Sequence, residues 1–214
     1  MQSQVPNLET FMQFDRAKLK AVILYTCSKC DSSDLGAVKL HKVLYYADML
    51  RYAAVGNSVT GATYRKRPLG PTCDQLLPTL RELGSEGAIN IRESDYFGYR
   101  KKEYVALREP EMARLSGEEV ELINEVIEFV CANNTAKTIS EYSHNRAWEM
   151  VEFSQVIPYS SVLHLFPTQV SNEALEWGAG LAEEIADQRS KTNPMDYVDF
   201  TAFRSRVLQA RDAE

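Results

Sequence analysis

Ser143 and His144 are the residues of this chain that most resemble catalytic groups, and Glu141 and Arg146 lie close to them in the sequence. A histidine base activates a serine nucleophile only when the two side chains are within hydrogen-bond reach. Adjacent residues on one helix point in different directions, so this pair is poorly placed for such chemistry. We therefore expect His144 to cap a helix end or to bond inside a junction, with Trp148 packing four residues on. Recognition and catalysis stay open as alternatives.

Four cysteines, at positions 27, 30, 73 and 131, could bind a metal or exchange electrons. Cys27 and Cys30 form a CxxC motif, but neither a second CxxC nor paired histidines accompany it, and a structural zinc site needs four ligands. A redox motif of this kind would follow a strand and open a helix, whereas here the motif is expected to end a helix. The sequence favours ordinary reduced thiols, with a metal site and a redox pair as the alternatives. We expect neither a metal nor another cofactor.

Two basic clusters, Arg65-Lys66-Arg67 and Arg100-Lys101-Lys102, lie among tyrosines. Basic side chains between aromatic rings can hold phosphates and stack on bases. Acidic residues interrupt the second cluster, however, and aromatic residues on strands commonly pack across the sheet. We interpret the clusters as a protein-contact face or a solvated strand edge, and we do not expect this chain alone to bind nucleic acid.

The composition is that of a soluble globular protein, with 44% hydrophobic and 25% charged residues in 214 positions. Residues 37–108 carry 12 basic and 7 acidic side chains, whereas residues 109–190 carry 4 basic and 15 acidic ones. The acidic half disfavours general nucleic-acid binding and favours a basic protein partner, although solvated helix faces would give the same count. The amino terminus does not have the pattern of a secretory signal. The uncharged stretch over residues 153–172 is interrupted by prolines, so it is not expected to span a membrane, and we expect a cytoplasmic protein.

The elements that must position these groups are mostly helices. Asp15 can cap a first helix. A second helix from about residue 35 to 55, ended by Gly56, is apolar around most of its circumference and should be the central one. Residues 59–67 read as a short strand, and Gly70-Pro71 as a turn that opens a helix over 72–83. Residues 89–91 and 99–107 predict a hairpin.

The second half of the chain also reads as helical. Ser116 and Glu119 form a capping box that opens a helix to about Ala132. Thr138 should cap a short helix, residues 146–153 should be helical again, and residues 172–189 predict an acidic amphipathic helix. Beyond a hinge at residues 191–194, a final helix would place Phe200 and Phe203 on one face.

These elements predict a mainly α (α+β) protein: a compact helical domain with a small β-hairpin or short antiparallel sheet. We expect an N-terminal extension over residues 1–14, the helical domain over 15–190, and a hinge with an amphipathic tail helix over 191–214.

Three segments resemble, in their order and spacing, the motifs of the Panacea domain family (DUF4065, SocA-like antitoxins). They are the helix from Lys39 to Ala47, the turn at Gly70-Pro71, and the segment from Glu141 to Trp148. The motif residues are Lys39, Leu40, Leu44, Tyr45, Tyr46, Gly70, Pro71, Ser143, His144 and Trp148. Two departures, Arg67-Pro68-Leu69 where the family has an aromatic residue and Thr72 where it has an aliphatic one, concern the surface around the turn.

The resemblance implies a non-enzymatic antitoxin of a type II-like toxin–antitoxin system that neutralises a cognate protein toxin by direct binding. A protease adaptor that delivers a bound toxin for degradation is the alternative, and a hydrolase or nucleotide-modifying enzyme built on His144 is the least favoured hypothesis. Homo-oligomerisation stays open. The residues expected to bind the partner, all taken as exposed, are Tyr64, Arg65, Arg67, Tyr96, Tyr99, Phe200 and Phe203.

Overall fold

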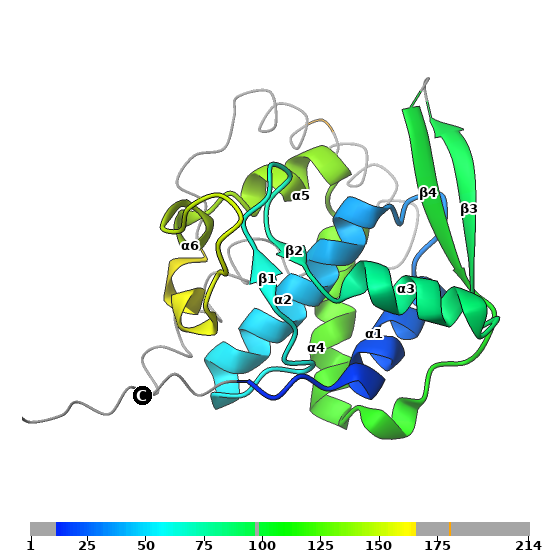
Figure 1. Ribbon diagram of the computed structural model, residues 1–214, viewed down its shortest axis with the longest axis horizontal. Coiled ribbons are helices and arrows are strands. Elements are labelled where there is room, and N and C mark those ends of the chain that lie inside the picture. Colours follow the sequence, from blue (N-terminus) through cyan, green and yellow to red (C-terminus); the bar gives the residue numbers. More distant parts are fainter. Residues whose placement is uncertain (1–11, 97–98, 166–179, 181–214) are drawn as a thin grey trace, which may run out of the picture.

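Helix α2 (Ala37–Val55) runs through the middle of the protein and is buried over most of its length (Figure 1). The computed structural model describes residues 12–96, 99–165 and 180. Apolar side chains cover α2 on most sides, and Gly56 ends the helix in the left-handed conformation, with φ 69° and its N–H bonded to the Tyr52 carbonyl at 2.8 Å. The predicted central helix is therefore confirmed.

Helices α1 (Arg16–Lys29) and α4 (Gly117–Ile127) pack against α2, and each begins at a side chain that satisfies its first N–H groups. The Asp15 carboxylate accepts a bond from the Lys18 N–H at 2.9 Å. Ser116 and Glu119 bond each other's backbone N–H groups at 3.1 and 2.8 Å, which completes the capping box. Both caps were predicted and are confirmed. Helix α4 continues into a π-helical turn, η2 (Glu128–Ala132).

The remaining described helices are short. They are α3 (Leu76–Ser85), η1 (Met112–Arg114), α5 (Ala136–Tyr142), α6 (Arg146–Glu149) and η3 (Tyr159–His164). With two small antiparallel sheets, they give the mainly α class that the sequence predicts.

Strands β3 (Ile89–Tyr96) and β4 (Tyr99–Ala106) form the predicted hairpin, in a register that pairs Ile89 with Ala106 and Tyr96 with Tyr99. The hairpin stands on the opposite side of the molecule from α6 (Figure 1). Buried Ile89 and Tyr104 anchor its base to the core.

A second, smaller sheet joins distant parts of the chain. Strand β1 (Tyr64–Arg65) pairs with β2 (Thr72–Cys73), and Arg65 also bridges to Val156 on a third segment. The N–H of Lys66 donates to the Gln155 carbonyl, and the N–H of Ile157 donates to the Tyr64 carbonyl. This sheet therefore fixes the loop after α6 beside β1.

Four local predictions are wrong in their boundaries. The helix expected over 72–83 starts at Leu76, because pairing with β1 holds Thr72 and Cys73 extended. The helix expected over 146–153 ends at Glu149. The cap of α5 is Thr135, and Thr138 is its capping-box partner three residues later. The strand expected over 59–67 is reduced to Tyr64–Arg65.

Tyr64 is 1% exposed, so the expectation that it lies on the surface is wrong. Its hydroxyl donates to the buried Asp48 carboxylate at 2.7 Å, and Thr60 donates to the same carboxylate through its N–H and its hydroxyl at 2.7 and 2.5 Å. Burial raises the pKa of Asp48, although these hydrogen bonds oppose the rise. Tyr64 thus serves to satisfy a polar group inside the core.

Several predictions fall outside the described residues: the acidic helix over 172–189, apart from residue 180, the tail helix with Phe200 and Phe203, and most of the N-terminal extension. Within the part of the chain that the structure describes, no helix is both long and apolar enough to cross a bilayer.

Candidate functional site

Lys42 connects helix α2 to the turn at Gly70-Pro71. Its side chain is 1% exposed, and its Nζ donates to the carbonyl oxygens of Leu69 at 2.7 Å and Pro71 at 2.9 Å. Burial lowers the pKa of Lys42 to about 7. A buried amino group thus supplies the hydrogen bonds that the carbonyls of the turn would otherwise lack.

Gly70 lies between Lys42 and Ser143, where only a glycine fits. Its φ is 89°, and a Cβ atom at this position would lie 2.1 Å from Ser143 Oγ and 2.7 Å from Lys42 Nζ. Ser143 is fully buried and donates its hydroxyl to the Ser140 carbonyl at 2.6 Å. The acceptor of the Ser143 proton is therefore a backbone carbonyl and not His144, in agreement with the expectation that this pair is poorly placed for catalysis.

His144 and Trp148 close the other side of the turn. Their rings stack with centroids 4.2 Å apart and an angle of 25° between planes. Burial and the nearby Lys42 lower the pKa of His144, while a hydrogen bond to the Pro68 backbone opposes this shift. The indole Nε1 of Trp148 donates to the Arg67 carbonyl at 3.2 Å. His144 therefore bonds inside a junction, as the sequence predicts.

The three segments that carry the resemblance thus meet at one place, which we name the turn junction: Lys42, Gly70, Pro71, Ser143, His144 and Trp148. The other motif residues on α2 are scaffold. Leu40, Leu44, Tyr45 and Tyr46 are buried in the core, and buried Lys39 pairs with Asp34 at 2.6 Å.

A surface of apolar and basic side chains lies directly over this junction, partly buried at Lys66, Arg67 and Trp148 and exposed at Met150 and Phe153. Lys66 Nζ lies 4.2 Å from the centre of the Trp148 ring and donates to the Val151 carbonyl at 2.9 Å. Arg67 lies 5.7 Å from the centre of the Phe153 ring. Phe153 and Met150 are each 60% exposed. We name these residues, Lys66, Arg67, Trp148, Met150 and Phe153, the Trp148 face.

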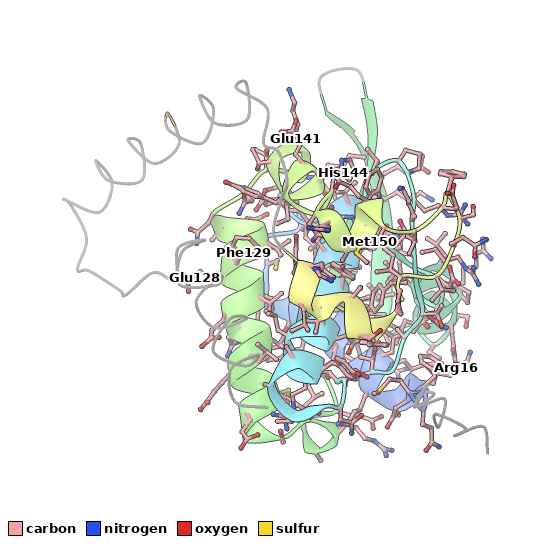
Figure 2. The ribbon with its side chains drawn as sticks, turned by 90° about the vertical axis from the view of Figure 1, so that its left-hand side faces the viewer. Arg16, Glu128, Phe129, Glu141, His144 and Met150 are labelled. Atoms are coloured by element: carbon pink, nitrogen blue, oxygen red, sulfur yellow. The ribbon has the colours of Figure 1, made fainter. Side chains whose placement is uncertain are left out.

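Figure 2 views the molecule from the α6 side and labels Met150 and His144 on the part turned toward the viewer. The loop after α6 is held there by Ser154, whose carbonyl accepts from Arg65 at 3.0 Å and whose hydroxyl accepts from Arg67. Arg65 is also paired with Asp74 at 2.6 Å. These hydrogen bonds to Ser154 therefore hold the loop of the Trp148 face in place.

Those partner-binding residues expected from the sequence that the structure describes do not lie together. Arg67 belongs to the Trp148 face and Arg65 supports it, whereas Tyr64 is in the core. Tyr96 and Tyr99 pair at the far end of the hairpin, on the other side of the molecule. Phe200 and Phe203 lie outside the described residues.

Sequence reasoning did not assign Lys66, Met150 or Phe153 to a binding site, and it treated Trp148 only as a motif residue. Two signals in the sequence could have pointed to this surface: the basic cluster at 65–67 and the aromatic and thioether side chains that follow Trp148. Among the described residues, no group of three or more His, Cys, Asp or Glu side chains is arranged to hold a metal ion.

A model of the family described as "Antitoxin SocA-like, Panacea domain" matches residues 40–149. The match runs from α2 to α6 and contains the whole turn junction. Neither a curated protein nor a solved structure matches the chain.

Proposed function

Because the chain belongs to the SocA-like antitoxin family with a Panacea domain, we propose that it neutralises a protein toxin by direct binding. The pair would be a type II-like toxin–antitoxin system acting in the cytoplasm, and the chain would block the toxin by covering its surface. The family supports the antitoxin role in general. The observation that carries the binding mode is the Trp148 face.

The side chains of the Trp148 face are those that commonly supply binding energy at protein interfaces. Tryptophan and arginine are enriched at interface hot spots, and aromatic residues and methionine are enriched across interfaces. Phe153 and Met150 expose apolar area that a partner can cover. An interface of ordinary size, about 1,600 Å² in total, would extend well beyond these five residues.

The rigidity of this face also favours binding. Trp148, Lys66 and Arg67 each donate to a group of the turn or of the loop after α6, so their positions are set before a partner arrives. Binding then costs less side-chain entropy than it would with mobile residues. The two cations favour a toxin surface with carboxylates around an apolar centre.

The test uses the protein encoded by the neighbouring gene, expressed alone and together with this chain. We expect growth arrest by that protein alone and rescue by the wild-type chain. The double variant Arg67→Glu/Phe153→Ala should fail to rescue and to co-purify, while its melting temperature stays close to that of the wild type. Phe153→Ala alone, a change at an exposed side chain, provides a second variant if the double variant is unstable.

The matched control is Leu77→Ala/Arg81→Glu on α3, which makes the same kinds of change at exposed positions away from the Trp148 face. It should rescue growth as the wild type does. Rescue by a folded Trp148-face variant would contradict the proposal.

Measuring toxin levels in the same cells separates direct neutralisation from the adaptor alternative. In direct neutralisation the toxin persists in a stoichiometric complex. In adaptor action it disappears, and only when both this chain and a cellular protease are present.

A further inference from the structure

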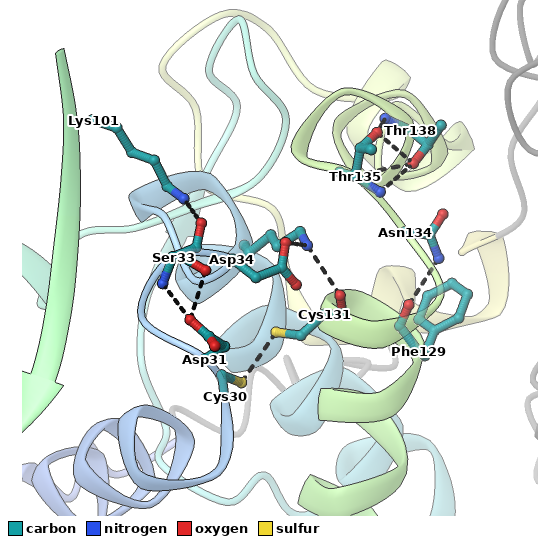
Figure 3. Close-up of polar contacts among 11 residues, drawn as sticks. Cys30, Asp31, Ser33, Asp34, Lys101, Phe129, Cys131, Asn134, Thr135 and Thr138 are labelled. Atoms are coloured by element: carbon teal, nitrogen blue, oxygen red, sulfur yellow. Dashed lines mark hydrogen bonds and ion pairs between the residues drawn. The ribbon is translucent and has the colours of Figure 1, made fainter. Parts of the chain in front are cut away.

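Cys30 and Cys131 form a thiol pair that the sequence does not indicate. Their Sγ atoms are 3.3 Å apart although the residues are 101 positions apart in the chain (Figure 3). Cys30 is the C-cap residue of α1, and Cys131 lies in the π-helical turn η2. Cys27, the other cysteine of the CxxC motif, is buried among the core residues of α1. The partner of Cys30 is therefore Cys131.

Hydrogen bonds around η2 hold Cys131 against Cys30. The buried Lys39 Nζ donates to the Cys131 carbonyl at 3.0 Å and pairs with Asp34 at 2.6 Å. The N–H of Asn133 donates to the Glu128 carbonyl at 3.0 Å, which gives the wide π-helical turn. Turns of this kind are frequent at functional sites. The two sulfur atoms meet in a fixed arrangement.

A hollow of about 430 Å³ lies beside the pair and gives small molecules access to it. Its lining includes both sulfur-bearing residues together with Lys29, Asp34, Asn124 and Glu128. Cys30 is partly exposed, whereas Cys131 is 7% exposed. A molecule of the size of a peroxide can therefore reach Cys30 first.

The two thiols differ in acidity. The hydrogen bond between the two sulfur atoms lowers the pKa of Cys30, and Lys39 lowers it further, against the opposing effects of burial and Asp34. The same hydrogen bond, together with burial, raises the pKa of Cys131. Since the thiolate is the nucleophile, Cys30 is the residue that reacts first.

We propose that Cys30 and Cys131 are an oxidation site, at which a peroxide converts the two thiols into an intramolecular disulfide. In the first step the Cys30 thiolate attacks one oxygen of the peroxide. An S–O bond forms, the O–O bond breaks, and, with hydrogen peroxide, the second oxygen departs as hydroxide. Cys30 is then a sulfenic acid. In the second step Cys131 sulfur attacks Cys30 Sγ; the S–S bond forms and the S–O bond breaks. The departing hydroxide takes the Cys131 proton and leaves as water.

The bond would tie the end of α1 to the π-helical turn η2 that follows α4, and so close a loop of about 100 residues. Cross-links that close long loops restrict the unfolded chain most strongly, so the oxidised protein should melt at a higher temperature than the reduced one. This inference does not depend on toxin binding, because oxidation and melting are measured on the chain alone.

The test treats the purified full-length chain with hydrogen peroxide and compares it with a sample kept in dithiothreitol. The oxidised chain should lose about 2 Da, the mass of two hydrogen atoms, and a proteolytic digest should contain one peptide pair joined through Cys30 and Cys131. The Cys131→Ser variant should not show this loss of mass, and dimedone should trap a sulfenic acid at its Cys30. Cys27→Ser, which changes the other cysteine of the CxxC motif, should form the disulfide as the wild type does.

The wild-type digest decides the question even if a variant fails to fold. A bond between Cys27 and Cys30 would overturn the proposal. The proposal would also be overturned if peroxide oxidised the thiols of the urea-unfolded chain but none of those in the native chain.

Discussion

The amino group of Lys42 and the carbonyl oxygen of Pro71 are 2.9 Å apart in the interior of the protein. This contact joins the central helix to the turn that carries Arg67 and supports the Trp148 face. The turn junction thus holds in position the segments that carry the Trp148 face.

Lys42 should make the stability of the fold depend on pH in the alkaline range. Its pKa is about 7 in the folded protein and 10.5 in the unfolded chain, so the unfolded state binds more protons between these values and stability rises with pH. Urea unfolding at several pH values measures this. The wild-type free energy of unfolding, minus that of Lys42→Met, should increase between pH 7 and 10.

Lys102→Met removes an exposed lysine from β4 and is the control for the loss of one charge. If the free energies of unfolding of the wild type and Lys42→Met instead differ by the same amount across this range, Lys42 titrates in the folded protein as it does in the unfolded chain. That result would contradict the prediction.

Gly70→Ala should destabilise the protein by about 3 kcal/mol, because it combines a positive φ with overpacking against Ser143 and Lys42. Gly84→Ala is the matched control: it lies within α3, and its new Cβ would meet nothing within 4 Å. Alanine there should stabilise the fold by about 0.5 to 1 kcal/mol. Equal effects of the two substitutions in chemical denaturation would mean that the junction is not tightly packed.

His41 should make the protein sensitive to acid. Its Nδ1 accepts a hydrogen bond from the Cys73 N–H at 3.1 Å, and burial, with Lys42 nearby, lowers its pKa from 6.5 to about 4. Below pH 6.5 His41 binds a proton in the unfolded chain, whereas in the folded chain it stays neutral down to about pH 4. Stability is therefore lost as the pH falls through this window, by about 3 kcal/mol for this group.

His41→Gln keeps a side-chain oxygen that can accept from Cys73 and removes the titration. Its free energy of unfolding should change less than that of the wild type between pH 6.5 and 4, whereas His164→Gln serves as the control for removing a histidine. If the wild type and His41→Gln lose stability in parallel, His41 is not the acid-sensitive group.

Local signals predicted the elements whose ends are set by neighbouring residues. The Asp15 cap, the Ser116 capping box and the stop at Gly56 each depend on contacts within one turn, and the structure has all of them. The hairpin of β3 and β4 is similarly local, since its two strands are only two residues apart in the sequence.

Long-range contacts explain what the sequence did not reveal. Thr72 and Cys73 are extended because β1 pairs with them, and Tyr64 is buried because Asp48, on another element, accepts its hydroxyl. No local pattern in the sequence brings Cys30 to Cys131. For the same reason the Trp148 face, assembled from residues about 80 positions apart, could not be predicted as one surface.

The affinity of the purified chain for the protein encoded by the neighbouring gene, measured by titration calorimetry, tests the central claim most directly. Arg67→Glu/Phe153→Ala should bind about 100-fold more weakly than the wild type, since each tenfold step corresponds to about 1.4 kcal/mol and two hot-spot residues are lost. Leu77→Ala/Arg81→Glu should bind within about threefold of the wild type. A folded Trp148-face variant that binds as tightly as the wild type would contradict the account.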